Sequence, residues 1–269
     1  MKRHVLSLVR SAGLLGRADR VMLIRGKLVT LGRNRVFARA NPNFATPPHD
    51  LSFDAYGHVD WAWYRETGRE HAELYARLIS EAIPAHRLDI LEWGCGPGRI
   101  IRHMREYLKD REVALTGTDA NERSIAWCER YIPGVTFATN AFLPPLAFAD
   151  ASFDATYNFS VFTHLSEPAQ KAWSLEMLRV LKPGGLLICS THGDWYRNRL
   201  AKQREVTRYD DGQTIIQAGY EEGKKWYLAL HPPRYVRDEL LRGFTNVHMA
   251  TIAPGSNLHQ DIWIASKPE

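Results

Sequence analysis

The chain has 269 residues, of which 45% are hydrophobic and 24% are charged, a composition typical of a globular protein with a sizeable core. Its formal net charge of +5 is uneven, because residues 1–50 hold ten Lys or Arg against two Asp and the remaining residues sum to −3. A body that is not basic argues against a nucleic-acid groove as the partner site. No apolar run reaches the roughly 20 residues that would span a bilayer.

The three cysteines lie far apart and form neither a CxxC pair nor a Cys/His cluster with the spacing of metal ligands. We therefore expect a reduced, cytoplasmic protein without a bound metal. The first residues resemble a signal peptide, but Arg10, Arg17 and Arg20 interrupt the apolar stretch, so we do not expect export.

Residues 1–40 have apolar positions at roughly helical spacing with Arg and Lys between them, which predicts one or two amphipathic helices. The simpler interpretation is a helical cover with a solvated charged face, and we favour it. The alternative is a basic helix that rests on an anionic membrane surface, which would place the protein at the inner membrane surface, or that grips a phosphate-bearing substrate.

Residues 41–60 are rich in Pro, Asn and Asp and are interpreted as a linker or lid loop. A helix is expected from Thr67 to Ile83, where Pro84 follows. These patterns predict two domains: a basic helical arm and lid over 1–66, and a main domain over 67–269.

Strand-like and helix-like segments alternate along the main domain. Strands are expected at 88–92, 113–118, 134–138, 153–158 and 185–191, and helices at about 98–108, 121–131 and 168–182. A helix near 234–242 precedes strands near 245–252 and 260–266, which a short Gly-containing link joins. We predict an α/β, doubly wound fold: a seven-stranded, mostly parallel sheet with an antiparallel last strand, N-terminal helices and a hairpin insertion after strand five.

The stretch "DILEWGCGPGRI", residues 89–100, places Gly94, Gly96 and Gly98 directly after a predicted strand. Glycines there permit positive φ and a close approach of the ligand to the backbone. The spacing Gly-x-Gly-x-Gly differs from the Gly-x-Gly-x-x-Gly of dinucleotide sites. Glu92 would repel a pyrophosphate and attract an ammonium or sulfonium group.

Together with later segments, this loop resembles the first motif of the class I S-adenosylmethionine-dependent methyltransferases. The resemblance covers about residues 85–192 and includes "LTGTDAN", "TNAFLPPLAFADASFDATY" and "EMLRVLKPGGLLICST". It implies that Asp119 holds the ribose hydroxyls and that Asn140 and Ala141 contact adenine. Asp is more usual at position 140, but the Asn carbonyl can still accept from the adenine amino group.

The resemblance therefore implies S-adenosylmethionine as the cofactor. The residues expected to bind it are Glu92, Trp93, Gly94, Cys95, Gly96, Gly98, Arg99, Asp119, Ala120, Asn140, Ala141, Asn158, Phe159 and Ser160.

Three histidines are candidate proton acceptors, because an aliphatic hydroxyl needs a base beside it whereas an amine needs only positioning. His192 follows the fifth strand, His164 follows the fourth, and His231 lies in the insertion. Each could instead cap a helix or pack in a loop. We rank His192 slightly above His164 and place His231 third.

The insertion over 192–233 is long for a strand–helix link and suggests a hairpin of 213–218 with 225–231. Its aromatic residues, with those of the lid region, could form platforms for sugar rings or could fill a small core. The tentative substrate contacts are Tyr64, Trp195, Tyr196, Trp226 and Tyr227.

We expect an enzyme that O-methylates a hydroxyl of a saccharide, glycan or glycolipid precursor in polysaccharide biosynthesis. An O- or N-methyltransferase of a small natural-product-like molecule would use the same core. A cofactor-binding protein without catalysis is a minor alternative, and a nucleic-acid substrate is not expected. The sequence leaves a homo-oligomer open.

Overall fold

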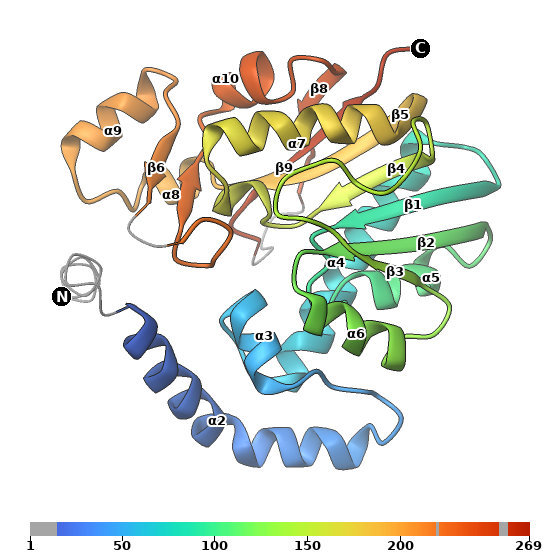
Figure 1. The fold of residues 1–269 in the computed structure, drawn as a ribbon, viewed down its shortest axis with the longest axis vertical. Helices are drawn as coiled ribbons and strands as arrows, with labels where there is room; N and C mark the ends of the chain where they lie inside the picture. The colour runs from blue at the N-terminus through green and yellow to red at the C-terminus, as the bar shows by residue number, and fades with distance from the viewer. Residues whose placement is uncertain (1–14, 219–220, 253–257) are drawn as a thin grey trace.

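The computed structural model describes residues 15–218, 221–252 and 258–269. A seven-stranded sheet in the order β3-β2-β1-β4-β5-β9-β8 forms its centre (Figure 1). Within this sheet only β9 runs in the direction opposite to the other six strands, which confirms the predicted fold class. The strands are β1 (Arg87–Trp93), β2 (Glu112–Asp119), β3 (Thr136–Thr139), β4 (Phe153–Asn158), β5 (Leu181–Thr191), β8 (Thr245–Met249) and β9 (Asp261–Ser266).

The central strand β1 pairs in parallel with β2 on one side and with β4 on the other. Its side chains alternate between two buried layers, with Ile90 in one and Leu91 in the other. The direction of strand succession reverses between β1 and β4, and ligands of open α/β sheets bind at the carboxyl ends of the strands at such a switch point.

Helices cover both faces of the sheet. Ile90 shares its layer with residues of α4 (Trp61–Ala82), η1 (Ile101–His103), α5 (Met104–Tyr107) and α6 (Glu122–Tyr131). Leu91 shares the other layer with α7 (Glu167–Val180), α10 (Pro233–Tyr235) and the π-helical turn η3 (Val236–Leu240). The single helices expected over 98–108 and 234–242 are therefore each divided into two short segments.

The N-terminal part differs most from the prediction. Residues 41–60, expected to be a loop, contain α3 (His49–Tyr56), which begins after Pro48 and ends at Gly57 in the left-handed region. Helix α4 begins at Trp61 because the Asp60 side chain accepts a hydrogen bond from the Trp63 amide. The predicted domain boundary between residues 66 and 67 thus falls inside a helix.

Helix α2 (Leu15–Ala40) stands off from the sheet, with α3 between it and the main body (Figure 1). Thr30, Asn34 and Phe37 are buried on its inner side. The Asn34 amide donates to the Val59 carbonyl (2.7 Å) and accepts from the Trp61 amide (3.0 Å), so polar contacts fix the helix to the start of α4. No helix in the described part of the chain is long and apolar enough to cross a membrane.

The insertion after β5 contains the expected hairpin, in which β6 (Ile215–Gln217) pairs antiparallel with β7 (Leu228–Leu230). Both strands are shorter than predicted. Two helices that the sequence analysis missed, α8 (Asp194–Arg197) and α9 (Gln203–Asp210), precede the hairpin.

Candidate cofactor and acceptor site

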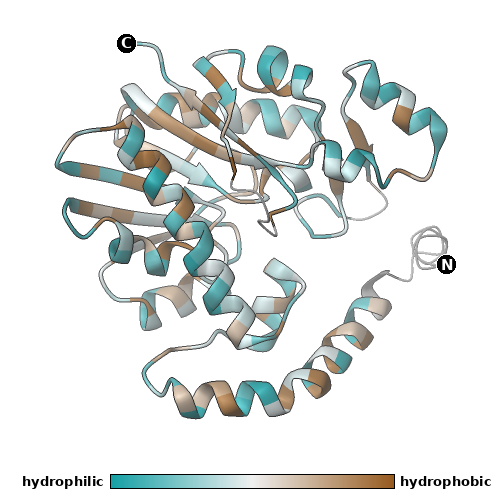
Figure 2. Cartoon of the chain, turned by 180° about the vertical axis from the view of Figure 1, so that it is seen from behind, coloured by the Kyte–Doolittle hydropathy of each residue, from teal (hydrophilic) through white to brown (hydrophobic). Residues whose placement is uncertain are grey.

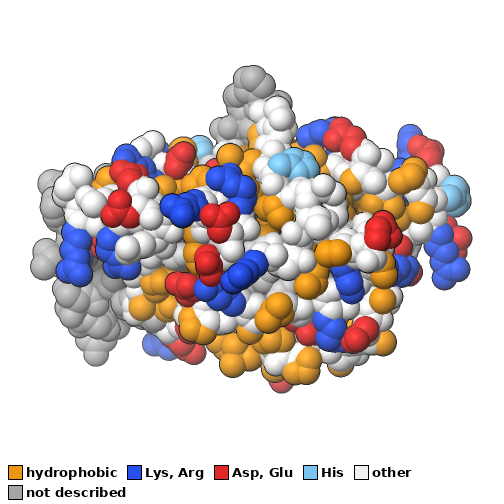
Figure 3. Space-filling model, turned by 90° about the horizontal axis from the view of Figure 1, so that it is seen from above, with side chains coloured by type: hydrophobic (Ala, Val, Ile, Leu, Met, Phe, Trp, Pro, Cys, Tyr) orange, Lys and Arg blue, Asp and Glu red, His pale blue; other side chains and the backbone are white. Residues whose placement is uncertain are grey.

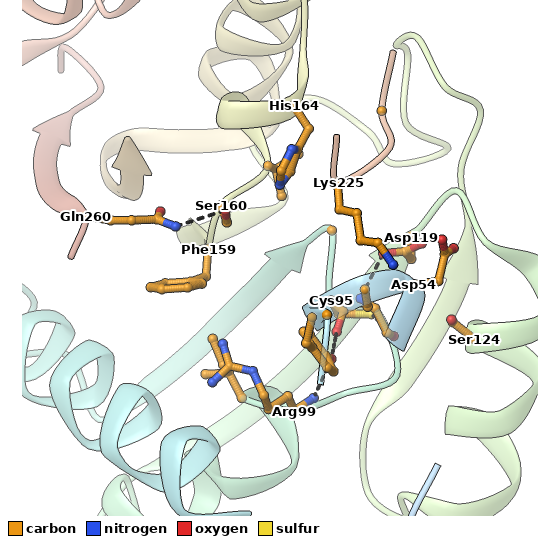
Figure 4. Close-up of a pocket in the computed structure, with 18 of the residues that line it drawn as sticks. Asp54, Cys95, Arg99, Asp119, Ser124, Phe159, Ser160, His164, Lys225 and Gln260 are labelled. Atoms are coloured by element: carbon orange, nitrogen blue, oxygen red, sulfur yellow. Dashed lines mark hydrogen bonds between the residues drawn. The ribbon is translucent and has the colours of Figure 1, made fainter. Parts of the chain in front are cut away.

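A cavity of about 1560 Å³ lies at the carboxyl ends of the central strands (Figure 4). The glycine loop and the ends of β2 and β4 form its floor. Helix α3, Met22 of α2 and the segment 221–226 of the hairpin insertion form the opposite wall. This is the place in the fold where a doubly wound sheet binds a nucleoside ligand.

The glycine loop has the backbone shape that the sequence predicted. Gly94, Gly96 and Gly98 have φ of 75°, 52° and 69°. A Cβ atom on Gly94 would lie 2.3 Å from Cγ2 of Val161, so both the backbone angle and the space require glycine. The Gly94 and Cys95 amides donate to the Thr118 carbonyl (2.7 and 2.9 Å), which fixes the loop to the end of β2.

Asp119 ends β2, and backbone groups hold its carboxylate in place. One oxygen accepts from the Gly96 amide and the other from the Asn121 amide, both at 2.8 Å. Each oxygen keeps a further lone pair, so the carboxylate can accept two hydroxyl protons from a ribose without moving. The side chain points into the cavity (Figure 4).

Glu92 ends β1 and is almost fully buried. The Tyr157 hydroxyl donates to its carboxyl group at 2.9 Å. Burial raises the pKa of Glu92 to about 8. This effect outweighs the hydrogen bond from Tyr157 and the charge of Arg99, which both lower the pKa. A cation beside this group would favour its ionised form.

Arg99 supplies a buried positive charge on the other side of the loop. Its guanidinium lies within 5.1 to 5.5 Å of the ring centres of Tyr56, Trp63 and Phe159, and donates to Oγ1 of Thr67 at 3.0 Å. Nε of Arg99 has no hydrogen-bond partner among the described residues. A carboxylate entering the cavity would find a cation there that the aromatic rings only partly compensate.

Asn140 follows β3 and lines the cavity. Its side-chain amide donates to the Ala141 carbonyl at 2.7 Å, and its Oδ1 is buried without a partner in the described part of the protein. A buried acceptor without a donor is costly, so this oxygen fits the amino group of a purine base.

Two of the three candidate histidines line the cavity, His164 and His192, with ring centres 6.3 Å apart. Nδ1 of His164 lies 2.8 Å from the Tyr227 carbonyl, so it carries the proton and Nε2 is left as the acceptor. Burial lowers the pKa of both rings, so both are neutral at pH 7. His192 stacks on Tyr196 with ring centres 3.6 Å apart.

His231 does not line the cavity. It is completely buried, burial lowers its pKa to about 3, and neither ring nitrogen has a hydrogen-bond partner among the described residues. Its position behind His192, whose carbonyl accepts from the His231 amide, gives it no access to an acceptor. The prediction of His231 as a proton acceptor is therefore not supported.

Most of the predicted cofactor residues lie together. The cavity is lined by Glu92, Trp93, Gly94, Cys95, Gly96, Arg99, Asp119, Ala120, Asn140, Phe159 and Ser160. Gly98, Ala141 and Asn158 lie outside it: Gly98 turns toward Ile132 and Cys128, Ala141 is exposed, and Asn158 is buried in the sheet.

Of the aromatic residues predicted to contact substrate, only Tyr196 and Trp226 line the cavity. Tyr64 is fully buried and donates to the Pro97 carbonyl at 2.7 Å, so it supports the glycine loop from behind. Tyr227 is buried, and Trp195 does not line the cavity but stacks on His259, which does. None of these three residues lines the cavity.

Several residues of the cavity were not foreseen. Tyr56 of α3 reaches the Cys95 carbonyl, and the Gln260 amide donates to Oγ of Ser160 at 2.9 Å (Figure 4). Gln260 directly precedes β9, and no sequence motif around it indicates that it would line the cavity. The Pro48 and Gly57 that delimit α3 were visible in the sequence and could have indicated Tyr56.

Comparisons with known proteins agree with this geometry. Residues 90–185 match the family model described as "Methyltransferase domain". A probable S-adenosylmethionine-dependent methyltransferase of Mycolicibacterium smegmatis is 35% identical over 126 residues, 46% of this chain and 44% of that protein. A ubiquinone biosynthesis O-methyltransferase of Cereibacter sphaeroides is 32% identical over 120 residues, 44% of this chain and 46% of that protein. The matches thus span slightly less than half the length of these curated relatives.

Two solved structures with bound S-adenosylhomocysteine share the fold. The Burkholderia thailandensis 1,6-didemethyltoxoflavin-N1-methyltransferase has a TM-score of 0.55 at 18% identity, over 84% of this chain and 92% of that one. The N-methyltransferase NodS of Bradyrhizobium japonicum has a TM-score of 0.53 at 15% identity, over 82% of this chain and 97% of that one. Residues 90–185 thus form a methyltransferase domain, and most of the chain shares the fold of solved S-adenosylmethionine-dependent methyltransferases of class I.

Proposed function

We propose that the protein transfers a methyl group from S-adenosylmethionine to a hydroxyl of a saccharide or of a glycan or glycolipid precursor. The observation that carries the proposal is His164, a neutral imidazole with its Nδ1 tied to a backbone carbonyl, in the wall of the cofactor cavity. A hydroxyl acceptor needs an oriented neutral histidine to take its proton, whereas an amine acceptor with a free lone pair needs only positioning.

The residues of the glycine loop and of the strand ends would hold the cofactor. Asp119 would accept hydrogen bonds from the ribose hydroxyls, and Asn140 would accept one from the adenine amino group. Glu92 would face the cationic groups of the cofactor, and Arg99 would face its carboxylate. When bound, S-adenosylmethionine supplies an electrophilic methyl group on a sulfonium, and its transfer to an oxygen leaves S-adenosylhomocysteine.

His164 would take the proton of the acceptor hydroxyl on Nε2 as the oxygen forms its new bond to carbon. The Tyr227 carbonyl accepts from Nδ1 and so stabilises the imidazolium that results. His192 would position the acceptor rather than take its proton, because its ring is stacked on Tyr196 and is less exposed than that of His164.

Polar side chains around the acceptor end favour a saccharide. Ser160, Gln260 and the two histidines can bind hydroxyl rims, while Tyr196 and Trp226 offer ring faces. Phe159, Ile252 and Leu258 give the same region an apolar side. This apolar side favours a second candidate, a small phenolic or otherwise natural-product-like acceptor.

Incubation with methyl-labelled cofactor and matched panels of saccharides and small phenols tests the proposal. We expect a methylated saccharide, and a His164→Gln variant that binds cofactor normally with kcat lowered by about 10²- to 10⁴-fold. His248→Gln, an exposed histidine away from the cavity, is the matched control and should be unchanged.

Product only with the phenols would favour the second candidate. Full activity of His164→Gln on a hydroxyl acceptor would overturn the role of His164. Cofactor binding without turnover on any acceptor would favour a non-catalytic protein.

A further inference from the structure

Helix α2 exposes an unusual amount of apolar surface. Of the twelve large hydrophobic side chains exposed among the described residues, seven lie on this helix: Val21, Met22, Ile24, Leu28, Val29, Leu31 and Val36. Ile24 is 59% and Leu28 70% accessible to solvent. An apolar surface gathered on one element, rather than scattered singly, indicates an interaction site.

Apart from Met22, which lines the cavity, the exposed apolar side chains of α2 do not face the main body. Thr30, Asn34 and Phe37 face the main body and are buried. Val21, Ile24, Leu28 and Leu31 recur every three or four residues, so they form a stripe on another face of the helix.

The same helix is strongly basic. It holds seven Arg or Lys against one acidic residue, Asp19, which is paired with Lys225 at 3.0 Å. Hydrophilic and hydrophobic residues alternate along it (Figure 2). By contrast, the face of the molecule drawn in Figure 3 shows basic and acidic side chains interspersed.

We propose that α2 docks the protein on an anionic lipid bilayer, with the stripe of Val21, Ile24, Leu28 and Leu31 entering the headgroup boundary. Neighbouring Arg and Lys can extend their aliphatic stems along the apolar layer and place their charges at the lipid phosphates. Each basic residue near an anionic surface adds to the attraction.

The charge of α2 favours a lipid bilayer over a second copy of the chain and over a nucleic acid. A second copy of the chain would bring a second basic helix against the first, and like charges repel. A nucleic acid would attract the basic residues but would leave the apolar stripe without a partner. An anionic lipid surface provides both a partner for the basic residues and an apolar layer for the stripe.

Docking through α2 would place the cavity beside the membrane. Met22 of α2 lines the cavity, and Asp19 accepts a hydrogen bond from the Trp226 indole (2.9 Å) in the opposite wall. If the proposed function holds, an acceptor carried on a lipid could then reach the cavity from the bilayer surface.

Vesicle flotation with the full chain tests the docking without any need for activity. Vesicles of phosphatidylcholine alone are compared with vesicles that also contain phosphatidylglycerol. We expect flotation with the anionic vesicles only, weakened by salt because screening shortens the Debye length from about 10 Å at 0.1 M to about 3 Å at 1 M.

The double variant Ile24→Asp/Leu28→Asp should lose about tenfold or more of its vesicle affinity. Leu175→Asp on α7, with a side chain 65% accessible, is the matched control and should float like the parent. Circular dichroism and the melting shift with S-adenosylhomocysteine establish that the variants are folded.

The proposal is overturned if the parent does not float, or if Leu175→Asp loses as much affinity as the α2 variant. It is also overturned if the parent is a dimer in solution that the α2 variant converts to a monomer while flotation is unchanged. None of these three results bears on the proposed methyl transfer, because the labelled-cofactor assay measures that separately.

Discussion

Single residues carry most of the argument for the cofactor, and Glu92 is the one whose chemistry is least ordinary. A carboxyl group with a pKa of about 8 is mostly protonated at pH 7. If it faces the cationic end of S-adenosylmethionine, binding must release its proton.

Cofactor affinity should therefore rise with pH, by up to tenfold per unit below pH 8, and level off above it. Calorimetric titrations in two buffers of different ionisation enthalpy count the released protons. Glu92→Gln has no such proton to release, so its affinity should depend less on pH than that of the parent. Equal proton release in parent and variant would show that Glu92 does not face the cation.

At the residue scale, sequence reasoning succeeded where a role depends on local backbone. Glycines after a strand and an acid at the end of the next strand can be read from a few neighbouring letters. Tyr64 and Tyr227 are buried outside the cavity lining, which the sequence could not show because an aromatic residue looks the same whether it lines a cavity or fills a core. The orientation of His164 depends on Tyr227, 63 residues away.

At the scale of the elements, the glycine loop offers a controlled comparison. Gly94 and Gly57 have nearly the same φ, 75° and 69°, but a Cβ atom would collide with Val161 at Gly94 and meet nothing within 4 Å at Gly57. Replacing either glycine by Ala would place a side chain on a left-handed backbone, which costs about 1–2 kcal/mol at both positions.

Gly94→Ala should lower the free energy of unfolding by about 1–3 kcal/mol more than Gly57→Ala, because overpacking adds to the strain. Urea unfolding of both variants measures the difference. Equal losses would mean that the loop yields to the extra methyl group and that its close packing is not required.

Most strands of the sheet were predicted well because they are short, largely apolar runs between turn residues. The helices around the cavity were predicted less well. Helix α3 is only eight residues long, and its position depends on contacts with the glycine loop that no periodicity reveals. Helix α9 has a single buried residue, Tyr209, and so lacks an apolar pattern.

At the scale of the whole molecule, the cavity is closed by segments from distant parts of the chain. Lys225 of the insertion pairs with Asp19 of α2 at 3.0 Å, donates to the Phe53 carbonyl of α3 at 3.0 Å, and lies 3.5 Å from the centre of the Phe53 ring. One side chain thus joins three elements above the cofactor site. Contacts across some 200 residues cannot be read from a single sequence.

Lys225→Met should loosen this closure while leaving the sheet intact. We expect hydrogen exchange in α3 to accelerate several-fold and the dissociation of cofactor to quicken, because local opening precedes both. Lys171→Met is a suitable control, since Lys171 is more exposed and pairs with Glu167 of α7 and Glu239 of η3, away from the cavity. Unchanged exchange in α3 would show that Lys225 does not hold the wall together.

The central claim is that S-adenosylmethionine binds against the glycine loop with Asp119 as its ribose acceptor. Calorimetric titration of the parent and of Asp119→Ala tests it most directly, with the exposed Asp110→Ala as the control. We predict one site per chain in the parent and in Asp110→Ala, and an affinity about a hundredfold weaker in Asp119→Ala, because two hydrogen bonds to a charged acceptor are lost. Absence of binding by the parent, or equal affinity in all three proteins, would contradict the account.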